Sequence, residues 1–72
     1  MSLSEKTVLV LTEMRKEKGR SLDGIAKQVN VSRDFLARVE RNEVSITIDT
    51  LEMLLQALKI EQKSFFQRLV EK

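Results

Sequence analysis

The sequence of 72 residues contains no cysteine and no histidine. Without cysteine it has neither a disulfide framework nor a thiolate metal site. Without histidine it lacks the usual general base, the usual zinc ligand and the usual pH switch. Carboxylates are present, but no pair of them stands out as an acid–base couple. We therefore expect neither an enzyme nor a protein that binds a metal, a cofactor or a small-molecule ligand.

Long hydrophobic runs are also missing from the sequence. The run Val8-Leu9-Val10-Leu11 has four residues, whereas a helix needs about 20 apolar residues to span a bilayer. No signal peptide is recognisable at the amino-terminal end. Together with the lack of cysteine, these features favour a cytoplasmic protein without a membrane partner.

Proline is absent as well, and glycine occurs only at Gly19 and Gly24. Because good helix formers such as leucine, glutamate, lysine and arginine are abundant, the composition predicts an all-α fold. The length allows one domain, which we take as residues 1–72. A core of this size is marginally stable, so tight helix packing or a partner subunit should add to its stability.

Apolar spacing, together with helix start and stop residues, predicts a compact bundle of five helices. The helices are expected at about residues 5–18, 22–29, 33–41, 48–58 and 62–71. The expected N-caps of the first four are Ser4, Ser21, Ser32 and either Thr47 or Asp49. Gly19 should end the first helix in the left-handed conformation. In the loop before the fourth helix, Ile46 and Ile48 are expected to reach the core, and residues 1–3 are assigned no role.

The net charge is only +2, from 13 basic and 11 acidic side chains, but it is unevenly distributed. Residues 15–41 hold eight basic and four acidic side chains, a net charge of +4, and the remainder carries −2. A basic centre within a neutral-to-acidic frame is an expected footprint of phosphate binding. A charged surface that contacts only solvent explains the same distribution equally well.

Residues 20–42, with the sequence RSLDGIAKQVNVSRDFLARVERN, predict two short helices around a tight turn at Asn30. Asparagine tolerates the left-handed conformation that such a turn requires, and Ser32 can cap the helix that follows. The unit spans about residues 22–41. In a small basic protein, such a unit most often places its second helix in the major groove of DNA.

A resemblance to a known family runs through two stretches, MRKEKGRSLDGIAKQVNVSRDFLARVERNE and TIDTLEMLLQALKI. They resemble the Cro and phage-repressor type of helix-turn-helix protein, the xenobiotic response element family. The resemblance covers roughly residues 7–66 and implies a lambda-repressor-like DNA-binding domain. It rests on dispersed matches at Arg15, Lys18, Gly19, Ile25, Ala26, Val31, Ser32, Leu36, Glu40, Arg41, Leu51 and Leu58.

Three further features resemble the controller proteins of restriction–modification systems. They are the turn Glu40-Arg41-Asn42, the segment Ile46-Thr47-Ile48 and the pair Phe65-Phe66. The controllers of this type are small homodimeric transcription regulators. Phage and plasmid repressors and some antitoxins share most of the same pattern.

The resemblance implies that the second helix of the unit reads bases with Arg33, Asp34, Ala37 and Arg38. The fork of Arg33 fits the O6 and N7 acceptors of guanine, and Ala37 can touch a thymine methyl group. Asp34 departs from the amide or hydroxyl that is usual at its position. It either accepts a hydrogen bond from cytosine N4, or it stabilises the start of the helix or orients Arg33.

The resemblance also implies one structural ion pair and a set of contacts with DNA phosphates. Arg15 and Glu40 are expected to pair and so to tie the first helix to the third. The expected phosphate-binding residues are Ser21, Lys27, Ser32, Arg41, Asn42 and Ser45. Glu43 departs from the family pattern, because a basic residue is common at its position.

The carboxy-terminal part carries more apolar surface than one helix can bury in so short a chain. We expect one of Phe65 and Phe66 in the core and the other in a symmetric dimer interface. The dimerisation region is expected at about residues 53–70, with Met53, Ile60, Phe65, Phe66, Leu69 and Val70 at the interface. Such a dimer places two recognition helices one turn of DNA apart, about 34 Å.

These features leave two functions open. The first is a homodimeric, sequence-specific DNA-binding transcription regulator that binds a pseudo-palindromic operator and regulates its own gene. The alternative is an antitoxin or adaptor subunit that uses the same fold to hold a protein partner. The acids Asp34 and Glu43 on the expected DNA face favour this alternative, because they would repel phosphates.

Overall fold

The computed structural model describes residues 1–72 and consists of five α-helices without a strand. The helices are α1 (Leu3–Glu17), α2 (Leu22–Val29), α3 (Arg33–Glu40), α4 (Ile48–Ala57) and α5 (Gln62–Val70). This confirms the predicted all-α bundle, and the helix ends differ from the predicted ones by at most two residues. None of the five helices is long and apolar enough to cross a membrane.

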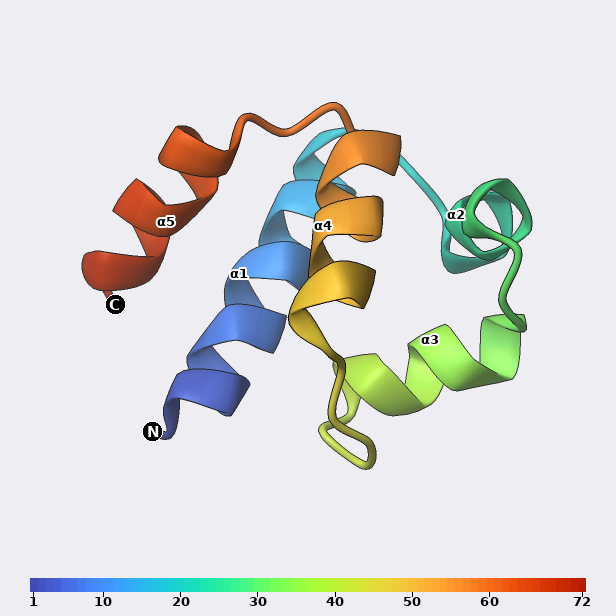
Figure 1. Cartoon of the computed structure of the whole chain (residues 1–72), viewed down its shortest axis with the longest axis horizontal. Coiled ribbons are helices and arrows are strands. Elements are labelled where there is room, and N and C mark those ends of the chain that lie inside the picture. Colours follow the sequence, from blue (N-terminus) through green and yellow to red (C-terminus); the bar gives the residue numbers. More distant parts are fainter.

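Helices α1 and α4 run through the middle of the molecule (Figure 1). Helix α5 packs against α1 on one side, while α2 packs against both α3 and α4 on the other. As a result, α3 and α5 lie at opposite ends of the protein, and α5 does not cover α3 (Figure 1).

The start of α1 differs from the prediction. Its N-cap is Ser2 rather than Ser4, so the first three residues do have a structural role. The Ser2 Oγ accepts a hydrogen bond from the Glu5 backbone N–H at 3.1 Å, and the Ser2 N–H donates to Glu5 Oε1 at 2.8 Å. This reciprocal capping box needs Glu or Gln three residues after the cap. Ser2 has Glu5 there, whereas Ser4 has Thr7.

The N-caps of α2, α3 and α4 agree with the predictions. Ser21 and Ser32 cap α2 and α3, and Thr47 rather than Asp49 caps α4. Gly19, with φ +68°, turns the chain after α1 in the left-handed conformation. Asn30, with φ 62°, does the same between α2 and α3.

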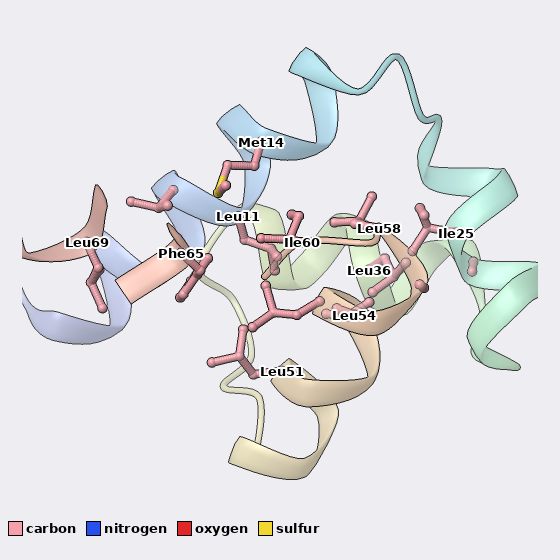
Figure 2. Close-up of a cluster of buried hydrophobic side chains, with 14 residues drawn as sticks. Leu11, Met14, Ile25, Leu36, Leu51, Leu54, Leu58, Ile60, Phe65 and Leu69 are labelled. Carbon is pink, nitrogen blue, oxygen red and sulfur yellow. The ribbon is translucent and has the colours of Figure 1, made fainter. Parts of the chain in front are cut away.

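The core is a cluster of 14 buried apolar side chains to which all five helices contribute (Figure 2). The core positions predicted from helical spacing are all buried, namely Leu11, Ile25, Leu36, Leu51, Leu54 and Leu58. Phe65 is completely buried, whereas Phe35 packs at the rim of the cluster, as expected. No charged or polar residue is buried in the core.

The loop before α4 differs from the prediction at one of its two isoleucines. Ile46 packs against the core, as expected, but Ile48 is 76% exposed. The prediction for Ile48 is wrong because Ile48 is the first residue of α4 and its side chain does not join the core cluster. Its side chain instead lines an open groove between α1, α4 and α5.

Candidate nucleic-acid interface

The segment α2–turn–α3 is fixed locally at each of its ends. The Ser21 Oγ accepts from the Gly24 N–H at 3.0 Å, and the Ser32 Oγ accepts from the Phe35 N–H at 3.0 Å. On α3, Leu36 and Val39 are buried in the protein. Because one face of this short helix is held inward, its opposite face, which carries the charged side chains, is turned to solvent.

Arg33, the first residue of α3, is exposed and has no hydrogen-bond or ion-pair partner in the protein. All of its guanidinium donors therefore remain available to a ligand. Ala37, one helical turn further on, is half-buried and has too short a side chain to obstruct Arg33. This part of α3 presents a free arginine fork above a small residue.

Arg38 and Arg41 follow on the same exposed side of α3, and each pairs with an acid. Arg38 Nε lies 3.0 Å from Asp34 Oδ2, and Arg41 Nε lies 2.5 Å from Glu43 Oε2. Asp34 thus pairs with Arg38 and not with its neighbour Arg33. The reason is helical geometry, since residues four apart face each other on a helix and adjacent residues do not.

The second of these pairs alters the acid–base behaviour of both partners. The hydrogen bond from Arg41 lowers the pKa of the Glu43 carboxyl, and the charge of Arg38 lowers it further. The same bond with Glu43 raises the pKa of Arg41. Both groups are therefore ionised at neutral pH, and the acid on the expected DNA face is neutralised by its neighbour.

Arg15 and Glu40 make the ion pair implied by the resemblance. Arg15 Nε and Nη2 donate to the two carboxylate oxygens of Glu40 at 2.7 and 3.0 Å. Arg15 Nη1 donates to the backbone carbonyl of Arg20 at 2.7 Å. Only 12% and 16% of the two side chains are exposed. Every nitrogen of this guanidinium has a partner, so Arg15 joins α1 to α3 and is not available to DNA.

All six residues expected to bind phosphate lie at the surface. The hydroxyl oxygens of Ser21 and Ser32 accept hydrogen bonds from backbone N–H groups. The hydroxyl hydrogens therefore remain free to donate to a phosphate oxygen. Lys27 pairs with Asp23 at 3.3 Å, but its side chain is 78% exposed. The others are Arg41, Asn42 and Ser45, and Asn42 adopts a left-handed conformation with φ 60°.

A family model described as helix-turn-helix matches residues 11–61 of the sequence. The chain belongs to the helix-turn-helix family. This confirms the predicted Cro and phage-repressor type of protein and, with it, the general prediction of a DNA-binding regulator. No curated protein sequence matches the chain significantly.

Solved structures of the restriction–modification controller protein C.Esp1396I are similar to this helix-turn-helix protein. The wild-type controller has a TM-score of 0.92 and 30% sequence identity, over 99% of this chain and 93% of that chain. A tetramer of the controller in complex with its natural 35-base-pair operator has a TM-score of 0.90, with the same identity and coverage. A complex with a 25-base-pair operator site has a TM-score of 0.89, again with 30% identity over 99% and 93%.

The residues expected at the dimer interface of this helix-turn-helix protein divide into two sets. Ile60, Phe65 and Leu69 lie in the core of the monomer and are at most 8% exposed, although Leu69 also lines the groove at which Ile48 lies. Phe65 and Leu69 are buried because α5 packs against α1, and Ile60 is buried in the turn between α4 and α5. The exposed members are Met53 at 41%, Phe66 at 45% and Val70 at 81%.

Phe66 borders an open apolar groove of about 290 Å³. Leu3, Ile48 and Leu51 line the same groove, and Leu3 and Ile48 are themselves mostly exposed. Phe66 also stacks edge-to-face on the buried Phe65, with ring centroids 5.3 Å apart. Phe66 thus contacts the core through Phe65 and also lines the groove.

The sequence patterns do not predict the contacts of Arg20, which help to place the helix-turn-helix unit. Arg20 Nη2 donates to Gln28 Oε1 at 2.7 Å, and Nη1 donates to the Ala57 carbonyl at 3.3 Å. These bonds tie α2 to the end of α4. The second acceptor is a backbone group 37 residues away, so no local signal points to it.

Proposed function

We propose that this protein is a homodimeric, sequence-specific transcription regulator of the restriction–modification controller type, which binds a pseudo-palindromic operator. The observation that carries the proposal is Arg33, an exposed arginine without a partner at the start of a helix whose other face is fixed in the core. An arginine fork at this place can donate to O6 and N7 of guanine in the major groove. The likeness to a controller of 30% identity that binds operator DNA supports the same conclusion.

The rest of the surface around Arg33 supports a contact with DNA phosphates. Ser21 and Ser32 present hydroxyl donors at the starts of α2 and α3, and the terminal nitrogens of Arg41 have no partner in the protein. Phosphate contacts of this kind orient a recognition helix on the duplex without reading its sequence. We assign orientation to these residues and base reading to α3.

Dimerisation is proposed through the groove that Phe66 borders. A symmetric pair covers the exposed faces of Leu3, Ile48 and Phe66, and apolar surface in contact with water favours such burial. Because α3 lies at the opposite end of the protein, the pairing leaves it free (Figure 1). Two copies of α3 then meet two half-sites of one operator.

The antitoxin or adaptor alternative loses its main support. It was favoured by Asp34 and Glu43, two acids on the face expected to meet phosphates. Both acids are paired with arginines, so they present no unneutralised negative charge to DNA.

In vitro selection of double-stranded DNA with the purified protein tests the proposal. We expect one preferred sequence with two inverted half-sites. Arg33→Ala should then lose discrimination at one base pair of each half-site by about 1–3 kcal/mol, with the other preferences retained. Lys63→Ala is the matched control, because it removes one exposed positive charge from α5, far from α3. Selection of no sequence, or an unchanged profile for Arg33→Ala, contradicts the proposal.

A further inference from the structure

Four charged side chains form a row along the exposed side of α3 and into the turn that follows. The row consists of Asp34, Arg38, Arg41 and Glu43, and we call it the charged row. Its two acids bracket its two arginines, so its net charge is zero. Arg33 lies beside the row and is the only arginine of α3 without a partner.

In both pairs of the charged row, the carboxylate lies next to the Nε atom of the arginine. Asp34 Oδ2 contacts Arg38 Nε at 3.0 Å, and Glu43 Oε2 contacts Arg41 Nε at 2.5 Å. A guanidinium has five N–H donors, and one of them is on Nε. Arg38 lies in an ion pair with Asp34 at Nε, and no hydrogen bond within the protein occupies its terminal nitrogens, which form the end of the fork that can bind O6 and N7 of one guanine. In Arg15, by contrast, all three nitrogens are occupied.

We propose that Asp34 is a positioning residue that determines which base Arg38 reads. This inference rests on the proposed DNA-binding function. Asp34 does not contact the base itself but holds Arg38 by Nε, which restricts the reach of a long and flexible side chain. It also keeps Arg38 from a backbone phosphate, since a carboxylate beside the guanidinium repels the phosphate.

The exposure of the pair argues that it serves recognition rather than folding. The side chains of Arg38 and Asp34 are 54% and 69% exposed. An ion pair in such contact with water adds little to stability. When α3 enters the major groove, the same pair loses water and its interaction strengthens. An arginine that is ordered beforehand also loses less conformational entropy when it binds.

α3 then carries two arginine readers of different kinds. Arg33 is free and adapts to the DNA as it binds, whereas Arg38 is ordered beforehand by Asp34. This difference predicts that the Asp34 carboxylate affects discrimination only at the base pair read by Arg38. It also gives Asp34 a role in addition to stabilising the start of α3.

The test uses the operator selected by the wild-type protein and a panel of its single-base-pair variants. Dissociation constants are measured for the wild type, Asp34→Asn, Arg38→Ala and the double variant. We expect Asp34→Asn to reduce discrimination at the base pair that Arg38→Ala affects, by about tenfold, and to leave the other positions unchanged. In the background of Arg38→Ala, the loss of Asp34 should have no further effect at that base pair.

Two controls separate positioning from charge. Asp23→Asn breaks the pair with Lys27 on α2, which has the same spacing of four residues and is also exposed. It should leave the whole discrimination profile unchanged. Asp34→Glu should keep most of the wild-type profile, since glutamate also reaches an arginine four residues further along a helix.

Four results would overturn the inference. If Asp34→Asn alters a base pair that Arg38→Ala does not affect, Asp34 reads a base directly. If it tightens binding equally to every variant of the operator, Asp34 acts only through its charge. If the wild type is selective and Asp34→Asn has the same profile, the positioning role fails alone, whereas a wild type that binds no DNA overturns the proposed function as well.

Discussion

Four arginines on α3 or next to it differ in how many of their nitrogens have a partner. Arg15 has a partner at each guanidinium nitrogen, Arg38 and Arg41 are held at Nε, and Arg33 has no partner. Residue type does not distinguish them, since all four are arginines within one basic segment. Their partners distinguish them. Arg15 holds α1 and α3 together, whereas the other three arginines remain available to DNA.

The Arg15–Glu40 pair leads to a prediction about stability. Arg15→Met leaves the largely buried Glu40 carboxylate without a partner, so we expect the free energy of unfolding to fall by about 3 kcal/mol. Urea unfolding at neutral pH and a fixed protein concentration measures the loss. The double variant Arg15→Met/Glu40→Met should recover much of it, because no unpaired charge remains. A double variant less stable than Arg15→Met would contradict this account.

At the level of residues, the sequence predicts the candidate site only in part. The Arg15–Glu40 pair follows from the resemblance, and the exposure of Arg33 follows from the apolar spacing of α3. The partner of Asp34 is Arg38 and not Arg33, although the spacing of four residues that joins them is visible in the sequence. The choice between Phe65 and Phe66 is not visible there, since it depends on how α5 packs against α1.

Among the helices, sequence reasoning succeeds where the ends are determined by local chemistry. Ser21, Asn30 and Ser32 act within a few residues of their own positions, so the limits of α2 and α3 can be predicted from them. The start of α1 is missed because Ser2 and Ser4 both resemble caps, and Glu5 decides between them. The position of Ile48 is missed because its exposure depends on which elements lie over the first turn of α4.

Helix α1 is held near both ends by glutamates with lowered pKa values. Hydrogen bonds from the backbone and side chain of Ser2 lower the pKa of Glu5, and the hydrogen bond from Arg68 lowers the pKa of Glu17. A carboxyl with a lower pKa in the folded state stabilises that state when ionised. Its contribution is complete above the ordinary glutamate pKa of about 4.3, and it is lost as the pH falls through the lowered value.

We therefore expect the free energy of unfolding to decrease as the pH falls below roughly 4. Urea unfolding over a series from neutral to acidic pH measures the effect. Glu5→Gln is an informative variant, because glutamine also serves in a capping box but does not titrate. It should keep most of the stability at neutral pH and lose less of it in acid. A wild-type stability that does not change across this range would exclude the account.

On the scale of the whole molecule, α3, which carries the candidate base-reading residues, and α5, which carries Phe66, lie at opposite ends (Figure 1). The core between them joins α3, through α1 and α4, to α5 (Figures 1 and 2). The separation allows either surface to be changed by substitution without direct contact with the other. Dimerisation and DNA binding can therefore be tested independently.

Phe66→Lys places a charge at the groove and removes the edge-to-face contact with Phe65, which is itself completely buried in the core. We expect the variant to be monomeric in analytical ultracentrifugation, because the charge opposes burial of the groove. Its affinity for an operator with two half-sites should fall by about 100-fold, since the second half-site is no longer bound within one complex. Leu9→Lys is the control, as Leu9 is 36% exposed on α1 and lies outside the groove. A dimeric Phe66→Lys variant would show that the copies meet elsewhere.

The two ends of the chain lie on the side of α5, away from α3 (Figure 1). A linker to a solid support or a fluorophore attached at either terminus therefore leaves the recognition helix pointing away from the attachment. The two termini nevertheless differ, because Leu3 and Ser4 line the apolar groove and Ser2 caps α1. An extension before Met1 lies next to both of these features, which makes the carboxy-terminal end the safer place for a label when both pairing and operator affinity are to be measured.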